Sequence, residues 1–270
     1  MNSPTPTHPF ALRFFQFSSR AWFVCLLFAQ SVFVTYLALG YGMASIQNQL
    51  AKWNTFNNTA FVEGDTLGNL FYGLHVLLAI VMILGGSLQL IPNIRNRYLG
   101  FHRYNGRFFV MLACTISLAG MYLILVRGTV GNAFLHAMTF LSGIMVLVAS
   151  FFAIRAAMKK RIACHEVWAT RLFLAANGVL FFRLFIFAWF MLFGALGVNT
   201  EDFTGPTVYA VSVCSYVLPL LVFEWVRYTK KNKAEVHQML VGILMTLIAC
   251  VFLIGLVGIT LSNWYPSLFK

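Results

Sequence analysis

Seven long apolar stretches follow one another along the chain, separated by short polar segments. Each has about the 20 residues that an α-helix needs to cross the ~30 Å hydrocarbon layer of a membrane. Only one connection, residues 47–66, is long enough to form a real loop. The pattern predicts an all-α, polytopic transmembrane helical bundle of about seven spans, which forms a single membrane domain over residues 1–270. The spans are expected near residues 21–46, 67–92, 106–127, 133–157, 172–198, 206–226 and 238–261.

Basic residues gather on one side of these spans, and this asymmetry predicts the orientation. Short loops that are rich in Lys and Arg stay in the cytoplasm. Fifteen of the 19 basic residues fall on the side of the N-terminus: Arg13, Arg20, Arg95, Arg97, Arg103, Arg107, Arg155, Lys159, Lys160, Arg161, Arg171, Arg227, Lys230, Lys231 and Lys233. We therefore expect the N-terminus in the cytoplasm and the C-terminus outside, in a multi-pass protein of the plasma (bacterial inner) membrane.

Tryptophans near the ends of the spans are expected at the two membrane surfaces, where one side of the ring contacts lipid and the other contacts water. These are Trp22, Trp53, Trp168, Trp225 and Trp264.

The composition supports a membrane protein and argues against several other classes. Hydrophobic residues make up 60% of the 270 positions and charged residues 10%, whereas a soluble domain has about 25% charged residues. The formal net charge is +12, but the basic residues form short clusters between apolar runs. We therefore expect the lipid bilayer as a partner and no nucleic acid. No CxxC or CxxCH spacing, phosphate-binding glycine loop or hydrolase motif is present, so no zinc site, covalent haem, ATPase or hydrolase is expected.

Spans two and three resemble spans four and five, which indicates an internal repeat. His75 and His136 open the two copies, and Arg95 and Arg155 follow them after 20 and 19 positions. Repeated units in membrane proteins commonly form a functional site where they meet.

The repeat predicts two pairs of histidines, one near each membrane face. His75 and His136 have depths that agree within about one helical turn, at a rise of 1.5 Å per residue, and His102 and His165 both lie at the inner surface. Two imidazoles from facing helices are the axial ligands that a b-type haem needs. We treat all four as candidate haem-iron ligands for one or two haem b groups. The candidate partners of the haem propionates are Arg107 and Arg171.

Two other functions stay open. The first is a non-redox transporter, or a protein that binds a lipid or an anion, which uses Arg183 near the middle of span five. An isolated charge at that depth costs at least about 2.5–3.5 kcal/mol, so Arg183 is expected to face the bundle interior and to have a polar partner. The second is an accessory membrane subunit. The inner histidines can also simply bind lipid phosphates or cap helices.

Two stretches resemble a known family: GGSLQLIPNIRNRYLGFHRYNGRFFV over residues 85–110, and CHEVWATRLFLAANGVLFFRLF over residues 164–185. They are similar to the bacterial integral membrane family catalogued as domain of unknown function 2306, which carries Q-x-x-P-x-[IL]-R, H-R-x-x-G-R and H-x-x-W-x-x-R segments and an intramembrane Arg. The matching positions are Gln89, Pro92, Arg95, His102, Arg103, Gly106, Arg107, His165, Trp168, Arg171 and Arg183. This resemblance implies a membrane protein and no particular activity.

More distantly, the layout of the four histidines on spans two to five is similar to that of the cytochrome b-561 superfamily of transmembrane di-haem electron carriers. That resemblance implies electron transfer of the oxidoreductase type, between a cytoplasmic or quinone donor and an acceptor at the outer face.

Overall fold

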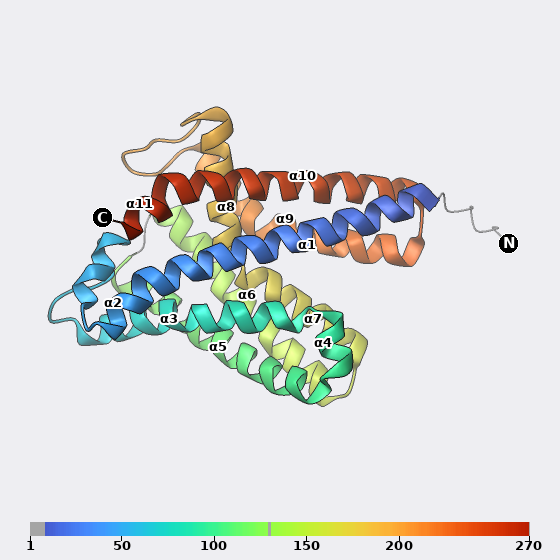
Figure 1. Cartoon of the computed structure of the whole chain (residues 1–270), viewed down its shortest axis with the longest axis horizontal. Helices are drawn as coiled ribbons and strands as arrows, with labels where there is room; N and C mark the ends of the chain where they lie inside the picture. Colours follow the sequence, from blue (N-terminus) through green and yellow to red (C-terminus); the bar gives the residue numbers. More distant parts are fainter. Residues whose placement is uncertain (1–8, 129–130, 270) are drawn as a thin grey trace.

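The computed structural model describes residues 9–128 and 131–269. Within these ranges the chain is almost entirely helical (Figure 1), and a single isolated bridge joins Asn199 to Thr204. The helices are α1 (Pro9–Leu37), α2 (Met43–Ile46), α3 (Thr66–Gln89), α4 (Pro92–Arg97), α5 (Leu99–Val126), α6 (Ala133–Met158), α7 (Ile162–Ala176), α8 (Gly178–Phe193), α9 (Pro206–Asn232), α10 (Glu235–Ile259) and α11 (Tyr265–Leu268).

Short π-helical and 3₁₀-helical turns connect helices in the first and last parts of the described chain. A π-helical turn, η1 (Ala38–Gly42), joins α1 to α2, and a second, η3 (Thr260–Trp264), joins α10 to α11. A 3₁₀ turn, η2 (Leu50–Thr55), lies in the first loop. The first and last spans are therefore continuous helical runs with one π-helical turn each.

The described residues contain six helical runs that are long and apolar enough to cross a membrane, and the bent pair α7–α8 makes a seventh. Because lipid offers no partner to free backbone groups, a chain that spans it must satisfy them inside helices or a closed barrel. The predicted all-α polytopic bundle is confirmed. The runs also extend beyond the predicted limits: the first begins at Phe10 and the last ends at Leu268.

Span five is not the single straight helix that the sequence predicts near 172–198. It begins at Ile162 and bends by 50° between α7 and α8, at Asn177. The side-chain amide of Asn177 donates to the carbonyl oxygen of Phe173, at 2.8 Å. The side-chain oxygen Oδ1 of Asn177 accepts from the side-chain amide of Gln30 on α1, at 2.7 Å. An Asn that bonds to nearby backbone competes with the helical ladder, which explains the break.

The two copies of the predicted repeat each form a helical hairpin. In the first copy α3 packs along α5, and in the second α6 packs along α7. Helix α5 also contacts α6 and so joins the two copies. The first and last spans pair with each other, since α1 runs along α10 (Figure 1), and α10 packs against α8. Helix α1 also packs against α3, so both copies contact the α1–α10 pair, the first through α3 and the second through α8.

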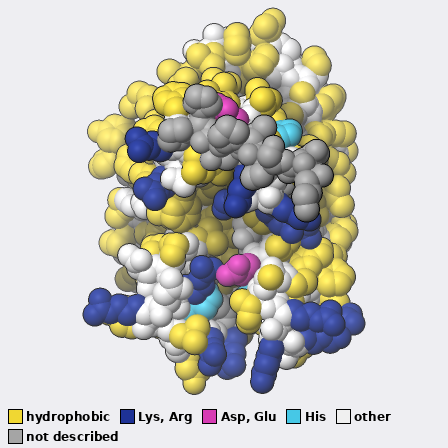
Figure 2. Space-filling view, turned by 90° about the vertical axis from the view of Figure 1, so that its right-hand side faces the viewer, with side chains coloured by type: hydrophobic (Ala, Val, Ile, Leu, Met, Phe, Trp, Pro, Cys, Tyr) yellow, Lys and Arg dark blue, Asp and Glu magenta, His cyan; other side chains and the backbone are white. Residues whose placement is uncertain are grey.

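The basic connections lie at one end of the bundle. The start of α1, the α4–α5 turn, the α6–α7 turn and the α9–α10 turn are all on the right of Figure 1. Figure 2 looks onto this end and shows Lys and Arg side chains distributed around it. This arrangement is what a cytoplasmic face requires, and we call it the inner end.

Two tryptophans expected at the membrane surface are instead buried. Trp53 is 3% exposed, and its indole nitrogen donates to the carbonyl oxygen of Tyr41, at 3.1 Å. Trp264 is 2% exposed and stacks on Phe33 and Tyr36. The prediction for these two residues was wrong, because both indoles pack against aromatic side chains of the first two spans: Trp53 against Tyr41 and Tyr72, and Trp264 against Phe33 and Tyr36.

The outer end of the first hairpin is closed by a charged cluster. The Arg127 guanidinium, at the end of α5, bonds to the Asp65 carboxylate before α3, with Nη2 at 2.6 Å from Oδ2. It also reaches Asn69 Oδ1 at 2.8 Å and the Ala60 carbonyl at 3.1 Å. The other Asp65 oxygen accepts from the Gly68 amide at 2.8 Å and caps α3. These bonds fix α3 and α5 at their outer ends.

Candidate functional site

The inner histidines of the two copies come together at the inner end of the bundle. His102 lies in the first turn of α5 and His165 in the first turn of α7, and they are within electrostatic range of each other. The two residues are 63 positions apart in the chain, so their proximity exists only because the two hairpins pack side by side.

The hydrogen bond of His165 fixes which of its ring nitrogens is available. Its Nδ1 is 3.0 Å from the carbonyl oxygen of Ala153 on α6. Since a carbonyl can only accept, Nδ1 carries the proton, and the neutral ring keeps a lone pair on Nε2. This is the bond that commonly orients a metal-ligating histidine.

His102 is half-buried, and one of its ring nitrogens lacks a hydrogen-bond partner among the described residues. Its Nδ1 is inaccessible to solvent, and no partner lies within hydrogen-bond distance among the described residues. A buried polar atom without a partner is uncommon and calls for an explanation. The backbone of the same residue is held in place by the side chain of Gln89 on α3, whose amide donates to the His102 carbonyl at 3.2 Å.

An ion pair lies beside the two histidines. Arg95 Nη1 of α4 is 2.8 Å from Glu166 Oε1 of α7. Both side chains are about half exposed, so this pair contributes little to stability, but it ties the first copy to the second. We call these five residues the inner histidine cluster: Gln89, Arg95, His102, His165 and Glu166.

The two predicted propionate partners have different surroundings. Arg171 already binds a carboxylate, because its Nε and Nη2 lie 3.0 and 2.7 Å from Glu224 Oε1, and its guanidinium stacks over Trp168 at 4.5 Å. Arg107 is exposed and lies 5.7 Å over the ring of Tyr104. In the part of the chain that the structure describes, Arg107 has no carboxylate within ion-pair distance. Of the two, Arg107 is therefore the one available to an added anionic group.

The outer histidines have separate neighbours. His75 Nδ1 lies 2.9 Å from the carbonyl oxygen of Ile116 on α5, and its ring fits against Gly120, where an added Cβ would come within 2.8 Å of it. His136 begins α6, near Gly128 at the end of the first hairpin. The bond to Ile116 directs the ring of His75 at α5, which packs along α3 and also contacts α6.

Arg183 faces the bundle, as the sequence predicts. Its guanidinium carbon lies 5.6 Å from the ring centre of Phe33 on α1. Its polar partner is the carbonyl oxygen of Val179, at a long 3.5 Å from Nη1. No carboxylate lies within 4.0 Å of it among the described residues. The polar side chains within its electrostatic range come from three other spans, and they are Tyr36, Tyr41, Tyr72, His75 and Tyr216.

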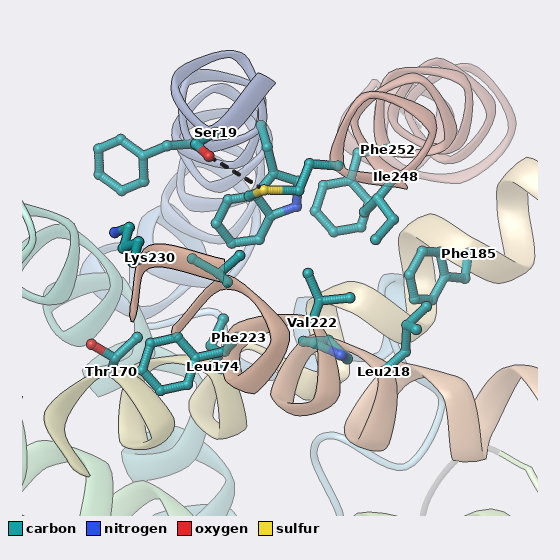
Figure 3. Close-up of a pocket in the computed structure, with 15 residues that line it drawn as sticks. Ser19, Thr170, Leu174, Phe185, Leu218, Val222, Phe223, Lys230, Ile248 and Phe252 are labelled. Atoms are coloured by element: carbon teal, nitrogen blue, oxygen red, sulfur yellow. Dashed lines mark hydrogen bonds between the residues drawn. The ribbon is translucent and has the colours of Figure 1, made fainter. Parts of the chain in front are cut away.

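An apolar cavity of about 280 Å³ lies between α1, α7, α8, α9 and α10. Figure 3 shows apolar side chains around it, with Lys230 and Thr170 on one side and Phe185 on the other. Ser19 points toward Met245 across it, at 3.4 Å. None of the predicted site residues lines this cavity. Its lining suits an apolar chain and offers no pair of metal ligands.

A group of aromatic residues was missed by the sequence analysis. Phe33, Tyr36, Tyr41, Tyr72 and Trp264 contact one another at the outer ends of α1, α3 and α10. We call them the aromatic cluster. A signal was available, because tyrosines inside an apolar span need partners for their hydroxyl groups. Their common location depends on folding and could not be predicted.

Comparison with known families identifies the region that carries these residues. The family of predicted membrane proteins called domain of unknown function 2306 matches residues 72–227, more than half of the chain. The chain belongs to this family. The matched region contains both repeat copies, the inner histidine cluster and Arg183. No curated protein and no solved structure matches the chain. The similarity to the cytochrome b-561 superfamily therefore rests on the layout of the histidines alone.

Proposed function

We propose that this multi-pass membrane protein holds a b-type haem between His102 and His165 and carries electrons at the inner end of the bundle. The observation that supports this most is the approach of the two histidines from α5 and α7. They come from different helices, as the two axial ligands of a haem held between helices of a bundle do.

The nitrogen atoms fit this role. His165 donates from Nδ1 to a backbone carbonyl, which leaves Nε2 as a ligand, and His102 has no competing protein partner at its buried Nδ1. A bound haem would supply one-electron oxidation and reduction. The chain has no CxxCH motif for covalent attachment, so the group would be held by its ligands and by packing.

The other residues of the inner histidine cluster keep the two ligands in position. Gln89 holds the backbone of His102, and the Arg95–Glu166 ion pair holds α4 against α7. Arg107 supplies a positive charge for a propionate. We expect the electron donor at this end to be a quinone or a soluble redox protein, because the cluster lies at the inner surface of the bundle.

The first test is the absorption spectrum of the protein purified in mild detergent, before and after dithionite. The proposal predicts the sharp bands of a reduced b-type haem. Substituting His102 or His165 by Ala should remove most of that absorbance, since one imidazole no longer binds iron. His237→Ala is the matched control, because His237 also lies at the inner end but is bonded to Trp225, at 3.3 Å.

Three results would contradict the proposal. A colourless protein from haem-replete cells would end the electron-transfer function. Absorbance that survives both inner substitutions and is lost in His75→Ala or His136→Ala would move the haem to the outer pair. Equal loss in His237→Ala would show that the effect of the substitutions is not specific to the inner pair.

A further inference from the structure

Two π-helical turns lie close together at the outer end of the bundle. η1 interrupts the first span and η3 the last, and these two spans pack along each other. Such turns are rare and occur mainly at functional sites, because the extra residue redirects the side chains that follow. Here η1 carries Tyr41 and η3 carries Trp264, both members of the aromatic cluster.

The aromatic cluster forms a wall of rings, stacked among Phe33, Tyr36 and Trp264 and edge-on or tilted at Tyr41. Trp264 stacks on Phe33 and on Tyr36, with ring centres 5.3 and 5.2 Å apart. The hydroxyl groups of Tyr41 and Tyr72 bond to each other at 3.2 Å. Four of the five rings are at most 9% exposed, and they are Tyr36, Tyr41, Tyr72 and Trp264. The wall is therefore an internal feature of the bundle and does not face lipid.

Two polar groups beside this wall lack adequate partners. The Arg183 guanidinium lies over Phe33 and has five N–H donors, yet within the described part of the chain its one acceptor is the distant Val179 carbonyl. The hydroxyl of Tyr36, a residue only 7% exposed, has no hydrogen-bond partner among the described residues. An intramembrane charge without compensation is costly and marks a functional position.

We infer that Arg183 and Tyr36 bind the carboxylate group of a small apolar acid, whose body lies against the aromatic cluster. A single guanidinium matches one negative charge, and its planar fork matches the two oxygens of a carboxylate. The tyrosine hydroxyl donates a further bond, and the partly exposed ring of Phe33 supplies an apolar surface. This site is separate from the inner histidine cluster and does not depend on the haem proposal.

The probe is benzoate, with benzamide as a neutral molecule of nearly the same shape. Thermal unfolding of the full-length protein in detergent is followed at constant ionic strength while either compound is titrated. We expect benzoate to raise the unfolding temperature of the wild-type protein in a saturable way, because it binds the folded state, and benzamide to have little effect.

Substitutions then assign the effect to Arg183. Arg183→Gln should raise the apparent dissociation constant for benzoate by about tenfold or more, since a charge-assisted hydrogen bond is lost. Arg183→Lys should bind more weakly than the wild type, because a lysine cannot form the planar fork. Lys230→Gln is the matched control, since it removes one positive charge from the apolar cavity between α1, α7, α8, α9 and α10 and should leave benzoate binding unchanged.

Tyr36→Phe provides a second test if Arg183→Gln does not fold. It keeps the ring in the wall and removes only the hydroxyl group, so it should fold and weaken benzoate binding several-fold. Equal effects of benzoate and benzamide, or wild-type benzoate binding in both the Arg183 and the Tyr36 variants, would overturn the inference. Benzoate binding by a colourless protein would support this site while contradicting the haem proposal.

Discussion

Each copy of the repeat has a histidine that bonds to the backbone of the other helix of its hairpin, but the two histidines come from different helices. In the first copy, the histidine of the first helix, His75, bonds to a carbonyl oxygen of the second helix, at Ile116. In the second copy, the histidine of the second helix, His165, bonds to a carbonyl oxygen of the first helix, at Ala153. His102, which matches His165 in the sequence, has no such bond at Nδ1 among the described residues. The two inner histidines therefore differ: the imidazole of His165 is hydrogen-bonded at Nδ1, and that of His102 is not, among the described residues.

The copies also differ in shape. Helix α5 runs without a break from Leu99 to Val126, whereas its counterpart divides at Asn177 into α7 and α8. The bend carries α8 away from the hairpin and onto α10. Arg183 follows the bend and reaches Phe33 on α1. The break in one copy thus provides a charged residue for the region around the aromatic cluster, and the straight copy has no equivalent.

Their outer ends are closed by different chemistry. The first copy uses the Asp65–Arg127 pair. The second uses a neutral side chain, because Asn132 caps α6 by accepting from the amides of Phe134 and Leu135, and its own amide donates to the Phe203 carbonyl at 2.7 Å. One closure therefore depends on ionisation and the other does not.

The largest expected loss of stability comes from a substitution that prevents α8 from packing closely on α10. A Cβ on Gly255 of α10 would overlap the backbone of Leu184, including its Cα at 2.9 Å, so Gly255→Ala must push α8 away. Overpacking of this kind costs about 1–3 kcal/mol or more in free energy of unfolding, measured by denaturation in detergent. Gly100→Ala is the control, because nothing lies within 4 Å of its Cβ position. Equal stability of the two variants would contradict the close α8–α10 contact.

The break itself is tested at Asn177. Asn177→Leu removes the acceptor of the buried Gln30 amide and the donor to the Phe173 carbonyl, and should cost about 1–2 kcal/mol. The double variant with Gln30→Leu should lose less than the sum of the two single variants, because the bond is already absent. Strict additivity in the same unfolding assay would show that this hydrogen bond does not stabilise the bend.

The neutral outer closure is expected to give a moderate effect. Asn132→Ala removes the cap of α6 and should cost about 1 kcal/mol, with the same value at every pH from 6 to 3. Thermal unfolding across this range measures it. A loss that changes with pH would indicate that Asn132 also supports an ionised group.

The smallest effect is the pH dependence of the charged closure. The Gly68 amide and the Arg127 guanidinium lower the pKa of Asp65 below its ordinary value of 3.8. The stabilisation by the ionised carboxylate is therefore fully present above pH 3.8 and is lost as the pH falls through the lowered pKa of the folded state. Asp65→Asn should reduce the acid sensitivity of the unfolding temperature. An unchanged acid profile would assign that sensitivity to other carboxylates.

The number and type of spans could be predicted from the sequence. The same holds for the gathering of basic residues at one end of the bundle and for the orientation of Arg183 toward the other helices. Individual side chains were less predictable. The burial of Trp264 and the bend at Asn177 depend on neighbours from other spans, namely the rings of Phe33 and Tyr36 and the amide of Gln30. The sequence placed His102 and His165 at one depth but contained no information on whether the two side chains would come within electrostatic range of each other.

The sequence by itself determined the membrane bundle, its basic end and the family, because hydrophobicity and charge act locally and a membrane leaves the backbone almost no alternative to helices. Only the tertiary structure decided that the inner histidines approach each other, that His75 bonds to α5, and that Arg183 lies over the aromatic cluster. The physical reason is rotation. Each residue turns a helix by about 100°, so the direction of a side chain is set by how neighbouring helices pack and bend, and not by its depth in the membrane.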